Sequence, residues 1–154
     1  MALDGQLSNW ILTENNEILY IDTSTPLFKL NNIEQLNPEL ILKTAPSFLR
    51  WILRLFFLKD VMGRYYDHRL VYLDLIANLY KEQRPDLIPT AIEIINNYIN
   101  VNEKPFDIKE VEKYYKEDKL IWTLFLAFRR FDKWLTTKIL RRRYEFILPG
   151  KIKR

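Results

Sequence analysis

Three side chains that could take part in catalysis or metal binding lie within the first 22 residues of this 154-residue chain. Asp4 and Asn9 stand in the order D-x-x-x-x-N, and Asp22 follows Asn9 after thirteen positions. Two interpretations are open. In the first, Asp4 is a loop carboxylate, Asn9 a turn residue, and Asp22 a cap for the TST segment that follows it. In the second, the three residues are the catalytic part of a larger enzyme.

A β-hairpin is the element that must position these residues. The segments WILT (10–13) and ILYI (18–21) are short, apolar and compatible with strands, and ENNE (14–17) between them has turn chemistry. Pro26 lacks a backbone donor, so the second strand cannot continue far past Asp22. We expect the hairpin to bring Asn9 and Asp22 to the same end of two paired strands.

This segment resembles the catalytic segment of the protein-kinase-like superfamily, in which H-R-D-x-x-x-x-N precedes a metal-binding aspartate. The resemblance is strongest to the aminoglycoside phosphotransferase and choline kinase branch. The matching stretches are DGQLSNWIL (4–12) and LYID (19–22), which agree in register with that branch. The likeness is specific over residues 4–22 and only architectural over 23–154.

The resemblance implies a role for each residue. Asp4 would orient the acceptor hydroxyl as the catalytic base, while Asn9 and Asp22 would bind Mg²⁺ and, through it, the phosphates of ATP. The implied reaction transfers the γ-phosphoryl group of ATP to a hydroxylated small molecule. The nucleotide-binding lobe of such a kinase would precede Asp4, so it would have to be supplied in cis or in trans, and the isolated chain is expected to be inactive.

Past residue 33 the sequence is helical, and we predict a mainly α fold, a kinase-like C-lobe with one small N-terminal hairpin. We expect a single domain over 1–154, made of the loop and hairpin segment 1–28, a helical bundle over 33–144 and a basic tail over 145–154. A helix over 45–59 is expected to be buried, and one over 60–83 to bury Val61, Tyr65, Tyr72, Ile76 and Leu79. Asp107 and Glu110 resemble a capping box. A last helix over 120–143 is expected to pack through a seam made of Leu120, Leu124, Phe128, Phe131, Leu135 and Ile139.

The rival hypothesis is a non-catalytic helical module that binds a protein partner or an anionic membrane surface. Much of the net charge of +4 lies in the arginines at 141–143 and in KIKR at 151–154, which could touch anionic lipid. FLRWILRLFFL (48–58) could be a membrane-surface helix, although a buried helix is the preferred interpretation. His68 is the only histidine and is expected on a helix surface.

Composition excludes several classes of protein. The chain has no cysteine, which excludes disulfides, thiolate zinc sites and cysteine nucleophiles. Its three glycines argue against a glycine-rich phosphate loop. The modest net charge argues against a dedicated nucleic-acid binder. No signal peptide is readable, and we expect a cytoplasmic protein.

Overall fold

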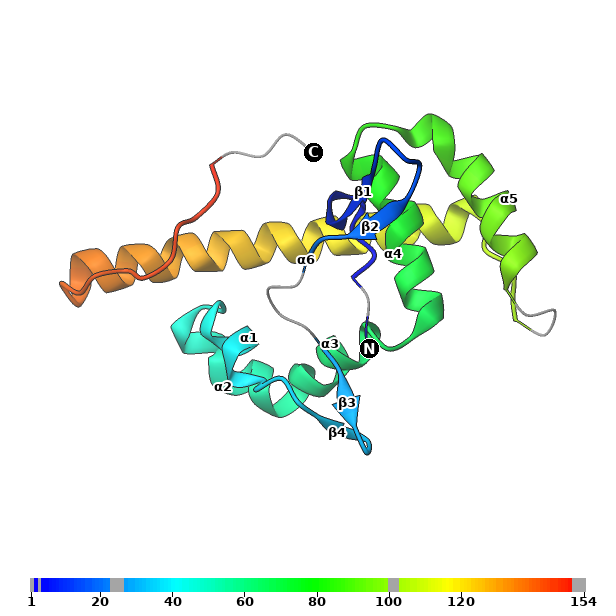
Figure 1. The fold of residues 1–154 in the computed structure, drawn as a ribbon. Helices are drawn as coiled ribbons and strands as arrows, with labels where there is room; N and C mark the ends of the chain where they lie inside the picture. The colour runs from blue at the N-terminus through cyan, green and yellow to red at the C-terminus, as the bar shows by residue number, and fades with distance from the viewer. Residues whose placement is uncertain (1, 3, 23–26, 100–102, 151–154) are drawn as a thin grey trace. The chain divides into compact units, whose positions relative to one another are not determined.

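The computed structural model describes residue 2 and residues 4–22, 27–99 and 103–150, and confirms a mainly helical protein with a small antiparallel hairpin near its N-terminus (Figure 1). The elements over the described residues, apart from short 3₁₀ and π turns, are β1 (Trp10–Leu12), β2 (Ile18–Tyr20), β3 (Lys29–Leu30), β4 (Ile33–Glu34), α1 (Glu39–Lys43), α2 (Arg50–Ile52), α3 (Leu58–Arg64), α4 (His68–Lys81), α5 (Ile88–Tyr98) and α6 (Ile108–Trp134).

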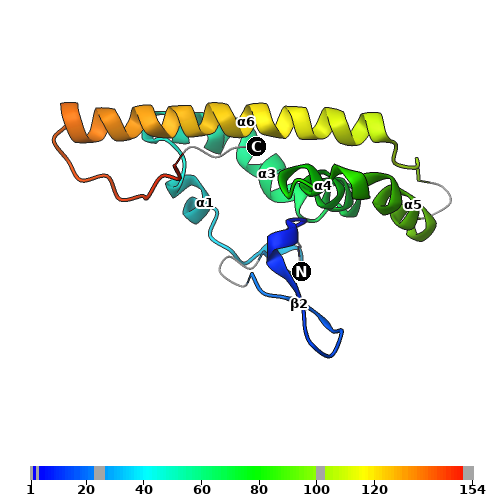
Figure 2. The same cartoon turned by 90° about the horizontal axis from the view of Figure 1, so that it is seen from above.

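The chain groups into two compact units. Unit 1 contains residues 1–36 and 63–117, and unit 2 contains residues 37–62 and 118–154. Helix α6 is continuous from one set of residues into the other (Figure 2).

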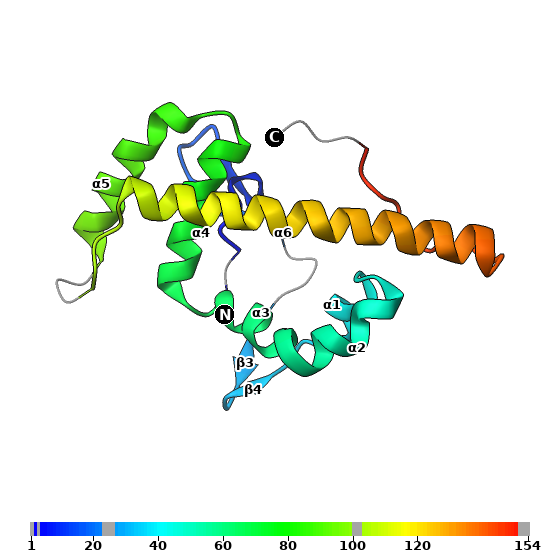
Figure 3. The same cartoon turned by 180° about the vertical axis from the view of Figure 1, so that it is seen from behind.

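Unit 1 holds the main hydrophobic core, which forms where α4, α5 and the start of α6 meet (Figure 3). Ile76 and Val111 are fully buried, and Phe106 and Ile88 are nearly so. Leu7, in the 3₁₀ turn Leu7–Asn9 ahead of β1, packs against this core. The core therefore fixes the segment that carries Asp4 and Asn9.

The expected helix over 60–83 is interrupted, because α3 ends at Arg64 and α4 begins at His68. Asp67 causes the new start, since its side chain accepts a hydrogen bond from the Leu70 backbone N–H and caps α4. Ile76 and Leu79 are buried as predicted, whereas Tyr72 and Val61 are exposed. Asn78 is a polar residue in the buried part of α4, and its Nδ2 donates to the Asp74 carbonyl at 2.9 Å.

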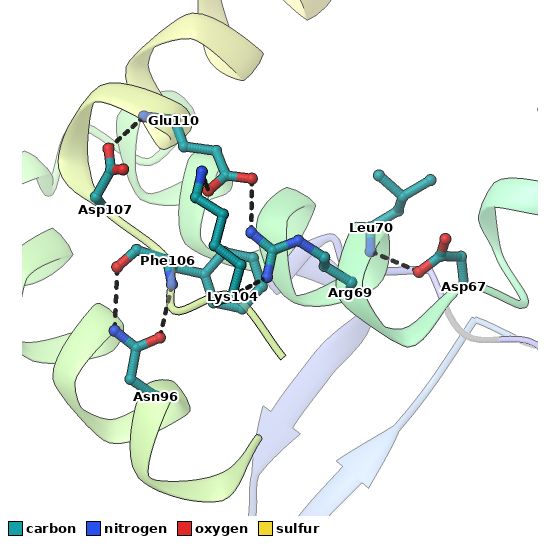
Figure 4. A network of polar contacts seen from close by, with 8 residues as sticks. All are labelled: Asp67, Arg69, Leu70, Asn96, Lys104, Phe106, Asp107 and Glu110. Atoms are coloured by element: carbon teal, nitrogen blue, oxygen red, sulfur yellow. Dashed lines mark hydrogen bonds and ion pairs between the residues drawn. The ribbon is translucent and has the colours of Figure 1, made fainter. Parts of the chain in front are cut away.

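The junction between α5 and α6 is held by polar side chains (Figure 4). Asp107 accepts a hydrogen bond from the Glu110 backbone N–H at 2.9 Å, as the capping box predicts, and this bond lowers the pKa of the Asp107 carboxyl. The Glu110 carboxylate does not return the bond. It pairs instead with Arg69 of α4 at 2.7 Å, and the Arg69 guanidinium also lies over the Phe106 ring. The start of α6 is thus tied to α4.

Asn96 of α5 completes this junction by pairing with both backbone groups of buried Phe106. Its Nδ2 donates to the Phe106 carbonyl at 3.0 Å, and its Oδ1 accepts from the Phe106 N–H at 2.8 Å (Figure 4). Helical spacing alone does not predict these bonds, because it cannot show that a distant loop presents two backbone groups to Asn96.

Replacing Asn96 with alanine should lower the free energy of unfolding by about 2 kcal/mol, because both Phe106 groups lose their partner while buried. Urea denaturation followed by circular dichroism measures this difference. Asn97→Ala is the matched control, since Asn97 is the exposed neighbour on the same helix. Equal stabilities for the two variants would contradict the assigned role of Asn96.

Two predictions about burial are wrong in unit 2. The segment expected to be a buried helix runs from α2 through the π-helical turn Leu53–Phe57 into α3, and it exposes Trp51, Leu55, Phe56 and Phe57. The predicted seam of the last helix is also largely exposed at Leu120, Leu124, Phe128, Phe131 and Ile139. The reason is a shortage of packing partners, since α1 is only five residues long.

Within unit 2, a few specific contacts join α6 to the segment before α2. Ser47 donates a hydrogen bond to buried Asp132, and Phe48 makes edge-to-face contacts with Phe128 and Phe131. Arg54 forms a bidentate pair with Glu39 of α1. Both partners of that pair are half-exposed, so it orients α1 more than it stabilises the unit. Residues 145–150 form no helix or strand, as expected for the tail.

Candidate functional site

The hairpin places Asn9 and Asp22 at one end of β1 and β2. Trp10 pairs with Tyr20, and the Ile21 backbone N–H donates to the Asn9 carbonyl at 2.8 Å, which extends the pairing one step beyond the strands. Asn9 precedes β1 and Asp22 lies two residues after β2 ends. The expected juxtaposition of these two residues follows from this antiparallel register.

Tyr20 lies among all three predicted site residues. Burial raises the pKa of its hydroxyl, and the nearby carboxylates of Asp4 and Asp22 raise it further. The Asp4 backbone and the Asn9 side chain lower it in part. We name Asp4, Asn9, Tyr20 and Asp22 the front cluster, since each of the other three acts on the Tyr20 hydroxyl.

Asn9 has an unsatisfied group in this cluster. Its side-chain Nδ2 is buried and makes no hydrogen bond of normal geometry, although it is near enough to the Tyr20 hydroxyl to lower its pKa. A buried amide with so weak a partner is destabilising, and such groups are found more often at functional sites than elsewhere. Rotating the amide by 180° would place the oxygen there, and an amide oxygen is a suitable ligand for a hard cation.

The Asp4 carboxylate accepts hydrogen bonds from within its own loop. Its Oδ1 accepts from the Gln6 backbone N–H at 3.2 Å, and its Oδ2 accepts from Gln6 Nε2 at 3.3 Å. The first bond forms an Asx-type turn that fixes the carboxylate. The second involves an exposed, flexible side chain that a substrate hydroxyl could displace.

Gly5 sets this loop directly on α4. A Cβ added at Gly5 would lie 2.6 Å from the Val71 carbonyl oxygen and 2.9 Å from the Leu75 backbone nitrogen. Only glycine allows so close an approach between two backbones. Gly5 therefore positions Asp4, its neighbour in the sequence, relative to a rigid helix.

The front cluster could hold a cation only with ligands from outside the protein. Across the described ranges, no group of three or more His, Cys, Asp or Glu residues gathers in a way that could hold a metal ion. Asn9 and Asp22 would supply one amide and one carboxylate oxygen. This small set suits Mg²⁺, which binds through one or two carboxylates and keeps water and phosphate oxygens as its other ligands. His68 is exposed at the start of α4, as expected.

Two residues of the site were not found by sequence reasoning. Tyr20 is two positions before Asp22, so strand alternation places both side chains on one face, and this signal was available. Gly5 follows Asp4 directly in a chain with only three glycines. Its role depends on a contact with α4 some 66 to 70 positions later, which local sequence does not reveal.

None of the helices over the described residues is long and apolar enough to cross a bilayer.

No curated protein and no solved structure was found to match the chain. A family model described as "Family of unknown function (DUF6206)" matches residues 1–133, a range that includes the front cluster, all of unit 1 and nearly all of α6. Because the match covers most of the 154 residues, this protein belongs to the DUF6206 family.

Proposed function

We propose that this protein is the helical lobe of a kinase-like phosphotransferase, similar in pattern to the aminoglycoside phosphotransferase and choline kinase group. The reaction is transfer of the γ-phosphoryl group of ATP to the hydroxyl of a small molecule. The observation that carries the proposal is the front cluster, in which the hairpin register brings Asn9 and Asp22 to one end of two strands, and Asp4, Asn9 and Asp22 all influence the pKa of Tyr20.

The roles follow from the chemistry of phosphoryl transfer, which depends on positioning and charge stabilisation more than on covalent help. Asp4 would accept a hydrogen bond from the acceptor hydroxyl and orient its oxygen for attack. Asn9 and Asp22 would hold Mg²⁺, which when bound neutralises phosphate charge. Tyr20 is protonated at neutral pH, and its raised pKa strengthens that state, so it adds no third negative charge to the cluster.

The proposed reaction also requires a nucleotide-binding lobe. A kinase holds ATP between two lobes, and the glycine-rich loop and the lysine that contact the phosphates belong to the N-terminal lobe. We propose that this lobe is supplied in cis or in trans, and that the chain without it has little activity.

The test is an assay on tagged full-length chain recovered from its source cells, so that any partner carrying a nucleotide lobe is retained. We expect Mg²⁺-dependent transfer of labelled phosphate from ATP to a panel of aminoglycosides and amino alcohols. Asp22→Asn should lower the rate at least about 100-fold by weakening metal binding. Glu14→Gln, a change at an exposed acid in the hairpin turn, should leave the rate unchanged. Transfer that is unaffected by Asp22→Asn, or no transfer at all, would refute the proposal.

A further inference from the structure

The two units differ strongly in charge. The ranges of unit 2 contain 15 Lys and Arg and five Asp and Glu, a net charge of +10. The ranges of unit 1 contain nine Lys and Arg and 15 Asp and Glu, a net charge of −6. The modest total of +4 therefore conceals a strongly basic unit.

Unit 2 also exposes a row of large apolar side chains along α6. Leu120 and Ile121 are 60% and 62% exposed, and the row continues to the end of the helix. We name this row the apolar stripe, and it consists of Leu120, Ile121, Leu124, Phe128, Phe131 and Trp134. At 100° per residue these positions fall on one side of the helix, over about 21 Å of its length.

Basic side chains border the apolar stripe on the same helical segment. Exposed Lys119, Arg130 and Lys133 lie away from the apolar stripe on the helical wheel, on a side that also carries Trp122 and Leu126. Arg141, Arg142 and Arg143 follow the π-helical turn Leu135–Ile139 that ends the helix, and all three are exposed. An apolar side rich in aromatic residues and bordered by Lys and Arg is typical of helices that lie in the plane of a membrane surface.

From this arrangement we infer that unit 2 docks on the surface of an anionic lipid bilayer through the apolar stripe. The basic residues bring the protein to negatively charged headgroups, and Leu, Phe and Trp side chains then enter the boundary between headgroups and acyl chains. Exposed Trp51, Phe56 and Phe57 of the α2–α3 segment belong to the same unit and add aromatic side chains suited to that boundary. The inference does not depend on the proposed phosphotransfer function.

The charge of unit 2 favours an anionic bilayer over a second copy of the chain as the partner of the apolar stripe. Pairing the apolar stripes of two molecules would bring two units of charge +10 together, which electrostatic repulsion opposes. An anionic bilayer offers the complementary charge together with an apolar layer, and it needs no matching groove.

The experiment is flotation of the full chain with large unilamellar vesicles of phosphatidylcholine alone or with about 30% phosphatidylglycerol. We expect binding to the anionic vesicles at least tenfold stronger than to neutral ones, falling as NaCl rises from about 0.1 M to about 0.5 M. Tryptophan emission should shift to shorter wavelength on binding, since Trp134 leaves water.

Two sets of variants separate the apolar and basic contributions. The triple variant Leu120→Gln, Ile121→Gln and Leu124→Gln should lose at least tenfold of the binding, while Leu12→Gln with Ile18→Gln, an equally exposed apolar pair in unit 1, should lose none. The triple variant Arg141→Gln, Arg142→Gln and Arg143→Gln, which leaves the helix intact, should reduce the preference for anionic vesicles.

Several outcomes would overturn the inference. These are no binding to anionic vesicles, equal binding to neutral vesicles, and undiminished binding by both triple variants. Binding of poly-glutamate or duplex DNA without binding of vesicles would also overturn it, and would indicate an anionic polymer as the ligand. A dimer in analytical ultracentrifugation without vesicle binding would do so too, and would indicate a second copy.

Discussion

Gly5→Ala is expected to destabilise the protein by about 3 kcal/mol, the upper range for an added group in a packed site. The new methyl group would lie 2.6 Å from the Val71 carbonyl oxygen, and the obstructing atoms are helix backbone that cannot rotate away. Either α4 shifts or the loop carrying Asp4 leaves the helix. Chemical denaturation measures the loss, and the Asp4 and Asn9 amide signals in NMR should move more than those of α5.

The matched control is the same substitution at Gly63 of α3. A Cβ at Gly63 would have no other atom within 4 Å, so alanine meets no obstacle there. We expect Gly63→Ala to stabilise the chain by up to about 1 kcal/mol through its higher helix propensity. Equal effects at the two glycines would show that Gly5 does not lie against α4 as described.

Ile76→Ala is expected to lower the free energy of unfolding by about 3–4 kcal/mol, because it empties a fully buried site in the core of unit 1. Thermal and urea unfolding should both report the loss. Ile94→Ala on α5 is the control, since Ile94 is half-exposed and its truncation leaves no cavity. If the two variants differ by less than about 1 kcal/mol, the core does not centre on Ile76.

Features of the fold that depend on residues close together in the sequence could be predicted from local rules. The hairpin and the capping bond from the Glu110 N–H to Asp107 follow from turn chemistry and capping. The same rules could have split the predicted helix over 60–83, because Asp67 is an N-cap residue type three positions before Leu70.

Burial was the property that periodicity could not decide. Helical spacing identified the seam from Leu120 to Ile139 as an apolar side, but it contains no information on whether another element covers that side. The same limit applies to Asn96, whose partner is the backbone of Phe106. Both depend on long-range packing.

One part of the candidate site could be predicted from local sequence, whereas another part depends on long-range packing. Asn9 and Asp22 could be placed together from sequence, because an antiparallel register fixes which residues face each other at a hairpin end. The approach of Asp4 to Tyr20 depends on how the loop packs on α4 through Gly5, which no local pattern contains.

We propose that the front cluster binds a divalent cation, and Mn²⁺ can be used to test this as a paramagnetic substitute for Mg²⁺. In ¹⁵N-labelled protein, substoichiometric Mn²⁺ should broaden the amide signals of Asn9, Ile21 and Asp22 before those of other residues. Asp22→Asn should weaken Mn²⁺ binding at least tenfold by removing a charged ligand, while Glu14→Gln should not change it. Broadening that begins instead among the acids near Asp107, or that is the same in Asp22→Asn, would contradict the claim.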